Sequence, residues 1–167
     1  MNAPDPLPDR IQAVRRIGGL AHQVRAGVRA ADRYLTMGLQ QDHDTACWLM
    51  SGAVGLAREL ADELDIMARE ARHGGVQGAA LQAIVKWRVH AHQLHASCRA
   101  ADLFLEQDAH DDRHTGTWLV ASALRLADQL SGLLDDGASR LALDRSRELT
   151  SPHGEAAGAA PLPSFGA

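Results

Sequence analysis

The chain has 167 residues, of which 46% are hydrophobic and 23% are charged, with a net charge of −4. This composition supports one domain with a hydrophobic core and excludes a disordered chain. No apolar run approaches the roughly 18 residues that cross a bilayer, and no export signal opens the sequence. With two cysteines, a disulfide framework is excluded. We therefore expect a cytoplasmic protein without a nucleic-acid or membrane partner.

The sequence repeats itself with an offset of 70 residues. Residues 21–65 align with residues 91–135 without a gap, and 19 of the 45 positions are identical. The identical segments include AHQ, RAAD and the dipeptide Trp-Leu. This self-similarity indicates that one structural unit was duplicated.

The first half of each copy carries apolar residues at alternating steps of three and four. The first series is Val14, Ile17, Ala21, Val24, Val28, Ala31 and Leu35; the second is Ile84, Trp87, Ala91, Leu94, Cys98, Ala101 and Leu105. This spacing is typical of a long helix that packs along its whole length. It predicts helices over 9–37 and 79–107.

The second half of each copy carries a similar series. Its members are Leu49, Ala53, Leu56, Leu60, Leu64 and Met67 in the first copy, and Leu119, Ala123, Leu126, Leu130 and Leu133 in the second. They predict helices over 42–72 and 108–136. Gly38 favours a turn before the first of these, and Gly74-Gly75 marks its end. Each copy is then a helical hairpin, repeat 1 over 9–73 and repeat 2 over 79–136.

Neither hairpin can bury its apolar stripe alone, so we expect an all-α protein in which both fold into one antiparallel four-helix bundle over 9–136. The expected helices carry net charges of +4, −4, +1 and −4 in chain order. Basic and acidic helices alternate, which favours contacts between neighbours. After Gly137 the pattern weakens. We expect a separate short helix over 137–149 and a flexible tail over 150–167.

Three tryptophans occupy informative positions. Trp48 and Trp118 stand at equivalent places near the start of the second helix of each hairpin. We expect them to close the ends of the bundle and to donate their indole N–H to Asp32 and Asp102. Trp87 stands where the first copy has Ile17, and we expect it in the core together with Cys98.

A polar stripe beside each apolar series is the candidate binding site. Its residues are His22, Arg25, Arg29 and Asp32 in the first copy, and His92, His95, Arg99 and Asp102 in the second. One interpretation is structural, with arginine and aspartate paired along the helix. In the other, the two stripes face each other across the pseudo-twofold axis and form a pocket for a small anionic ligand.

Metal binding is a further alternative, because the chain has nine histidines. His43, His110 and His114 lie near the expected turns, close to Asp42, Asp111 and Asp112. The Glu-x-x-His pairs of di-iron bundles are missing, as are Cys-x-x-Cys, His-Glu-x-x-His and Gly-x-Ser-x-Gly. We therefore predict no cofactor, no metal site and no catalytic residues.

The segments His22–Gly27 and His92–Ser97 are similar to the phosphoacceptor segments of histidine phosphotransfer and histidine-kinase dimerisation domains. Those domains are four-helix bundles with a histidine on an exposed helix face. The similarity covers six residues in each copy, and the second copy has His95-Ala96 where the pattern has a basic residue and glycine. It implies His22 or His92 as a phosphoacceptor.

The sequence favours a non-enzymatic interaction or regulatory module that acts through protein–protein contacts, with a protein partner or a second copy of itself. The alternatives are a phosphoacceptor protein and a bundle that binds a small anion or a metal through the polar stripes.

Overall fold

The computed structural model describes residues 7–37, 40–107 and 110–150, and it confirms an all-α four-helix bundle. The described residues form α1 (Leu7–Met37), α2 (Gln40–His73), α3 (Gly78–Leu105) and α4 (His110–Thr150). Within these ranges, none of the helices combines the length and apolar character needed to cross a membrane.

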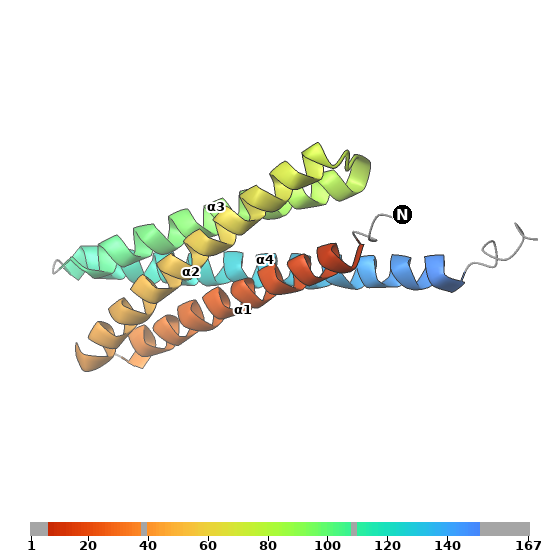
Figure 1. Cartoon of the computed structure of the whole chain (residues 1–167). Helices are drawn as coiled ribbons and strands as arrows, with labels where there is room; N and C mark the ends of the chain where they lie inside the picture. Colours follow the sequence, from red (N-terminus) through yellow and green to blue (C-terminus); the bar gives the residue numbers. More distant parts are fainter. Residues whose placement is uncertain (1–6, 38–39, 108–109, 151–167) are drawn as a thin grey trace, which may run out of the picture.

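The helices pack in a cycle, and Figure 1 shows that successive helices run in opposite directions. The pairs α1–α2, α2–α3, α3–α4 and α1–α4 pack against each other, so α1 and α3 lie on one diagonal of the bundle. The ends of α1 and α3 and the starts of α2 and α4 meet at one end of the bundle. Basic α1 therefore lies between acidic α2 and acidic α4, as the charge pattern predicts. An ion pair between Arg16 and Glu63 joins α1 to α2.

The apolar series of the first helix in each hairpin is confirmed. Its members are buried from Val14 to Ala31 in α1 and from Trp87 to Leu105 in α3, while Leu35 and Ile84 at the ends are partly buried against this core. In α2 and α4 the centre of the buried face is richer in alanine than the leucine series suggests. The fully buried residues there include Ala46, Met50, Ala53, Ala57, Leu60, Leu64, Val120, Ala123, Ala127 and Leu130. Leu49, Leu56, Leu119 and Leu126 of the predicted series are half-buried at its edge.

The end of α2 follows from its two glycines. Gly75 has a φ of 70°, in the left-handed region that only glycine adopts readily. In this conformation the N–H of Val76 reaches back to the carbonyl of Ala71 at 2.9 Å, and the N–H of Gly74 reaches that of Glu70 at 2.8 Å. These bonds satisfy carbonyls that the end of a helix leaves without partners. The predicted end at Gly74-Gly75 is confirmed.

The last helix differs from the expectation. α4 continues without a break from His110 to Thr150, so residues 137–149 are its last turns and not a separate short helix. Gly137 lies inside α4 because the ring of Trp87 packs against it: a Cβ at this position would be 2.3 Å from Cζ2 of that ring. The glycine therefore reflects a packing requirement. The tail predicted over 150–167 lies, from residue 151 on, outside the described residues.

The prediction for two of the three tryptophans is wrong. Trp87 is buried, as expected, with 6% of its surface exposed, but Trp48 is 75% and Trp118 is 63% exposed. In α2 the core positions next to Trp48 are Ala46 and Met50, each two residues away. Two residues correspond to more than half a turn of helix, so the indole points outward. Among the described residues, neither Trp48 nor Trp118 closes an end of the bundle.

Candidate functional site

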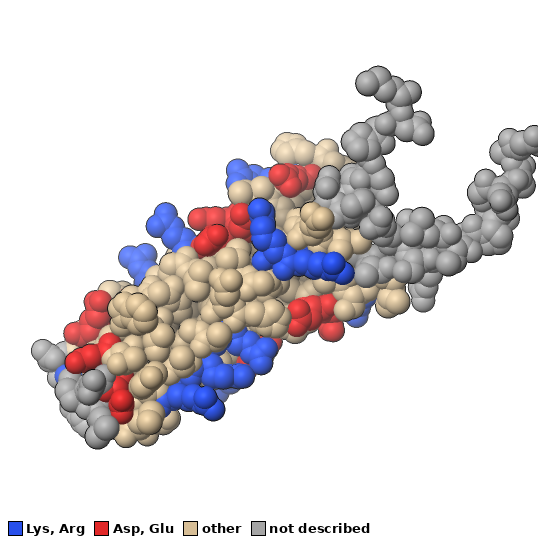
Figure 2. Space-filling view, turned by 60° about the horizontal axis from the view of Figure 1, so that its bottom comes forward, with Lys and Arg blue, Asp and Glu red and all other residues tan. Residues whose placement is uncertain are grey.

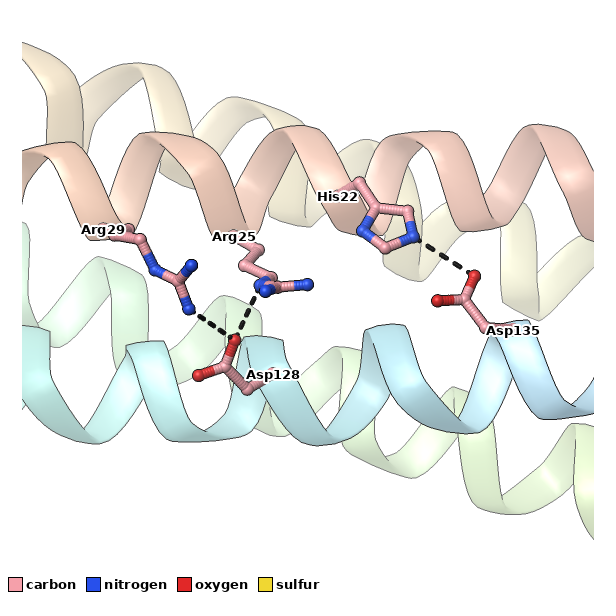
Figure 3. A network of polar contacts seen from close by, with 5 residues as sticks. All are labelled: His22, Arg25, Arg29, Asp128 and Asp135. Carbon is pink, nitrogen blue, oxygen red and sulfur yellow. Dashed lines mark hydrogen bonds and ion pairs between the residues drawn. The ribbon is translucent and has the colours of Figure 1, made fainter.

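Three residues of the first polar stripe bind α4 (Figure 3). Nε2 of His22 is 3.1 Å from Oδ1 of Asp135. Nε of Arg25 and Nη2 of Arg29 lie 2.7 and 3.1 Å from the same Oδ1 of Asp128. These side chains are a third to a half exposed. Each pair therefore contributes about 1 kcal/mol or less, which orients α1 on α4 more than it stabilises the fold.

The second stripe binds α2 instead. Nε2 of His92 is 3.3 Å from the carboxylate of Asp65, and Nε of Arg88 forms an ion pair with the same residue at 2.8 Å. Near the other end of the groove, the hydroxyl of Ser51 donates to Asp102 at 2.8 Å. α3 is thus held to α2 by polar contacts along most of its length.

The two histidine contacts are related by the repeat. His22 and His92 are equivalent, and so are Asp65 and Asp135. Each hairpin gives the histidine of its first helix to the aspartate on the second helix of the other hairpin. Reciprocal contacts of this kind are typical of a twofold interface. Here they relate the two halves of one chain.

The pocket expected between the stripes is not formed. The first stripe faces α4 and the second faces α2, so they lie in separate grooves. α1 and α3, which would have to enclose a shared pocket, are diagonal to each other. Asp32 does not repeat the contact of Asp102, because Ala121 stands where the other groove has Ser51. No hydrogen bond joins either exposed indole to Asp32 or Asp102 in the described ranges.

One position breaks the symmetry of the grooves. Asp128, which binds Arg25 and Arg29, has Arg58 as its equivalent in α2. Burial lowers the pKa of His95, and the positive charges of Arg99 and Arg58 lower it further. The groove between α2 and α3 therefore gathers positive charge where the other groove holds a carboxylate. Arg58 and Asp128 were not among the predicted site residues, although the repeat shows a charge reversal between these equivalent positions.

A shallow groove lies along α1. It has a volume of about 540 Å³ and is lined by His22, Arg25, Ala26, Arg29, Ala30, Arg33, Tyr34 and Met37. The predicted polar stripe includes His22, Arg25 and Arg29 of this groove, but not Arg33 and Tyr34. These two positions are Leu103 and Phe104 in the second copy, so the repeat gives no signal for them. On the face drawn in Figure 2, charged side chains of one sign gather in groups beside a broad uncharged area.

His43, near the turn between α1 and α2, contacts the end of α3. Nε2 of His43 is 3.1 Å from the carbonyl oxygen of Leu105, and Sγ of Cys47 is 3.7 Å from the same oxygen. Both side chains thus contact the last carbonyl oxygen of α3, which has no hydrogen-bond partner within the helix. Where the structure describes side chains, no group of three His, Cys, Asp or Glu residues is arranged to hold a metal. The side chains of residues 110–112 fall outside that part of the chain.

The two thiols should react at different rates. Burial raises the pKa of Cys98 to about 12, and burial followed by the charges of Asp44 and Asp102 raises that of Cys47. Because the thiolate is the nucleophile, we expect iodoacetamide at mildly alkaline pH to label half-buried Cys47 slowly and Cys98 only after denaturant is added. Mass spectrometry of tryptic peptides measures both rates. Equal rates in the folded protein would contradict the buried position of Cys98.

No family model, curated protein or solved structure matches the chain.

Proposed function

We propose that this protein is a non-enzymatic interaction module that binds partner proteins through the outer faces of α2 and α4. The observation that carries the proposal is the exposure of Trp48 and Trp118, 75% and 63%, at equivalent positions of the two repeats. Tryptophan is highly buried on average in folded proteins. It is also enriched among the few residues that dominate the energy of protein–protein interfaces.

The surroundings of Trp48 add support. Gly52 and Gly55 follow on the same exposed side of α2, and a Cβ at either position would meet nothing within 4 Å. The packing of the bundle therefore does not require these glycines, although each costs a helix about 1 kcal/mol relative to alanine. Bare backbone beside an exposed indole allows a partner to approach α2 closely. On α4 the equivalent positions are Ser122 and Arg125, so the two faces offer different surfaces.

Site-specific photocrosslinking in the source cells tests this proposal. We expect p-benzoylphenylalanine placed at position 48 or 118 to give discrete protein adducts after irradiation, because these side chains lie in the contact. Gln93, exposed on α3, is the control position, and we expect no adduct there. The readout is a shifted band identified by mass spectrometry.

Two further measurements make the result decisive. Trp48→Ala and Trp118→Ala should leave the free energy of unfolding within about 0.5 kcal/mol of the original value, because both side chains are exposed. Loss of binding in these variants then reports on the interface and not on the fold. Adducts of equal yield at all three positions, or none at 48 and 118, would refute the proposal.

Binding of an anionic group along α1 is a second candidate function, supported by the groove. Arg25, Arg29 and Arg33 line one open surface together with Tyr34. An acidic segment of a partner protein has the charge and the extended shape for this surface. Because the groove is shallow and formed by residues of one helix, it suits such a segment better than an enclosed small molecule.

The geometry gives less support to a phosphoacceptor. The side chains of His22 and His92 are 45% and 47% exposed, so solvent reaches both rings. Nε2 of each ring, however, faces an aspartate carboxylate at 3.1 and 3.3 Å. A phosphoryl group arriving at Nε2 would meet that negative charge.

A further inference from the structure

The α1–α4 groove and the α2–α3 groove are formed by equivalent positions of the two repeats. The contacts in one groove therefore indicate which residues should come together in the other. Between α1 and α4, Oδ1 of Asp128 binds Nε of Arg25 at 2.7 Å and Nη2 of Arg29 at 3.1 Å. At the equivalent positions of the other groove, α2 carries Arg58, and α3 carries His95 and Arg99. The carboxylate at the centre of the first arrangement is thus replaced by a third basic side chain.

Contacts on both sides place these three residues together. Ser51 and Asp65 of α2 each bind α3, through Asp102 and His92. Arg58 lies midway between these two anchors on α2. Because α2 and α3 are antiparallel neighbours, Arg58 is opposite the middle of the segment between the two anchors on α3. In that middle segment, His95 and Arg99 continue the helical steps of three and four between His92 and Asp102, so they lie on the same face of α3 as these two contacts.

We infer that Arg58, His95 and Arg99 form a binding site for the phosphate group of a small molecule, which takes the place that the Asp128 carboxylate has in the other groove. Guanidinium groups on facing helices present paired N–H donors that match phosphate oxygens. An imidazole beside them adds a donor, and a positive charge once it is protonated. In the first groove one carboxylate binds two arginines and leaves a net charge of +1. The second groove has two arginines and an ionisable histidine with no carboxylate at the equivalent of Asp128, so it has the charge to hold a dianion.

The charges around this site favour an anion. After burial, the largest influences that lower the pKa of His95 are the positive charges of Arg99 and Arg58, followed by that of His92, while Asp62 acts in the opposite direction. Asp62 belongs to α2 and is 4.0 Å from Arg58, a long ion pair along one helix. Arg58 itself is 75% exposed, so its guanidinium can turn toward a ligand. A bound phosphate would oppose the arginine charges and raise the pKa of His95.

The experiment is a titration of the full chain with inorganic phosphate, followed by NMR of the histidine rings. Ionic strength is held constant with chloride, since surface charges are screened by salt. We expect phosphate to shift the signals of His95 and to raise its pKa, and to leave those of His22 in place. Organic phosphate esters in a second titration then show whether the group is bound free or as part of a larger molecule.

Two reciprocal substitutions test whether the residues at positions 58 and 128 determine which groove binds phosphate. Arg58→Asp recreates the carboxylate of the other groove, and we expect phosphate to bind His95 and its neighbours about tenfold more weakly or worse. Asp128→Arg builds the basic arrangement between α1 and α4, and there we expect the His22 signals to become sensitive to phosphate. Arg15→Asp, an exposed position of α1 with the same change in charge, is the control and should bind phosphate normally.

Several outcomes would overturn the inference. If Arg15→Asp weakens binding as much as Arg58→Asp, phosphate responds to net charge alone and is an adventitious ion only. If phosphate leaves His95 unshifted in the original protein, the site does not exist. Arg99→Gln removes a donor without adding negative charge, so retained binding in this variant would also contradict the assignment. Unfolding curves of each variant show whether the fold is kept.

Discussion

Replacing Leu60 or Leu130 by alanine is expected to lower the free energy of unfolding by about 2–5 kcal/mol in each case. Both leucines are fully buried, and they occupy equivalent positions of the two repeats. Because the neighbouring core positions Ala57 and Ala127 are also equivalent and buried, the two cavities should be alike. We therefore expect the two costs to agree within about 1 kcal/mol, measured by urea unfolding.

The comparison has internal controls. Leu103 is half exposed on α3, and Leu103→Ala should cost less than about 0.5 kcal/mol. Ile17→Ala and Trp87→Ala should differ from each other, because the two repeats place side chains of different size at this position. A gap of several kcal/mol between Leu60→Ala and Leu130→Ala would contradict the view that both hairpins contribute equally to one interior.

The core of α1 and α3 was predictable because large apolar side chains mark its centre. Val14, Val24 and Leu94 recur with the helical period and are buried as predicted. In α2 and α4 the centre is marked by small residues such as Ala57 and Ala127, which add little to a hydrophobic pattern. The leucines at the edge gave the stronger signal there, so the predicted series combines edge residues such as Leu56 with core residues such as Leu60.

The polar stripes show a different limit of sequence patterns. Spacing places His22 and His92 on the flank of an apolar face, which the structure bears out. It does not say which neighbour that flank meets, since this depends on the cyclic order of the helices. A sequence can place a residue around its own helix axis, whereas the partners Asp135 and Asp65 lie 113 and 27 residues away along the chain.

The exposed tryptophans were mispredicted for a related reason. Because of its hydrophobicity, a large apolar side chain near a helix start was expected to close the end of the bundle. The helical phase of Ala46 and Met50 excludes Trp48 from the buried face. Phase is the more reliable guide in a bundle, because every turn of α2 must direct the same side inward.

Gly137→Ala is expected to destabilise the protein by about 1–3 kcal/mol, against the usual effect of removing a glycine from a helix. The added Cβ would lie 2.3 Å from Cζ2 and 2.6 Å from Cη2 of Trp87. The ring is buried, so it cannot turn into solvent without losing its packing. The gain in helix propensity, about 1 kcal/mol, is too small to offset this overlap. Thermal or urea unfolding measures the change.

Gly132 provides a control for Gly137→Ala, and the first copy of the repeat suggests a compensating pair of substitutions. Gly132 lies on the same helix with nothing within 4 Å of a Cβ, so Gly132→Ala should stabilise the protein by about 0.5–1 kcal/mol. The first copy has Ile17 and Met67 where the second has Trp87 and Gly137. The second copy thus pairs a large residue with a small one, whereas the first copy has two residues of intermediate size. Combining Trp87→Ile with Gly137→Met should therefore restore much of the stability that Gly137→Met alone removes. If Gly137→Ala instead stabilises the chain as Gly132→Ala does, Trp87 does not pack on α4. The presence of a glycine at position 137 would then need another explanation.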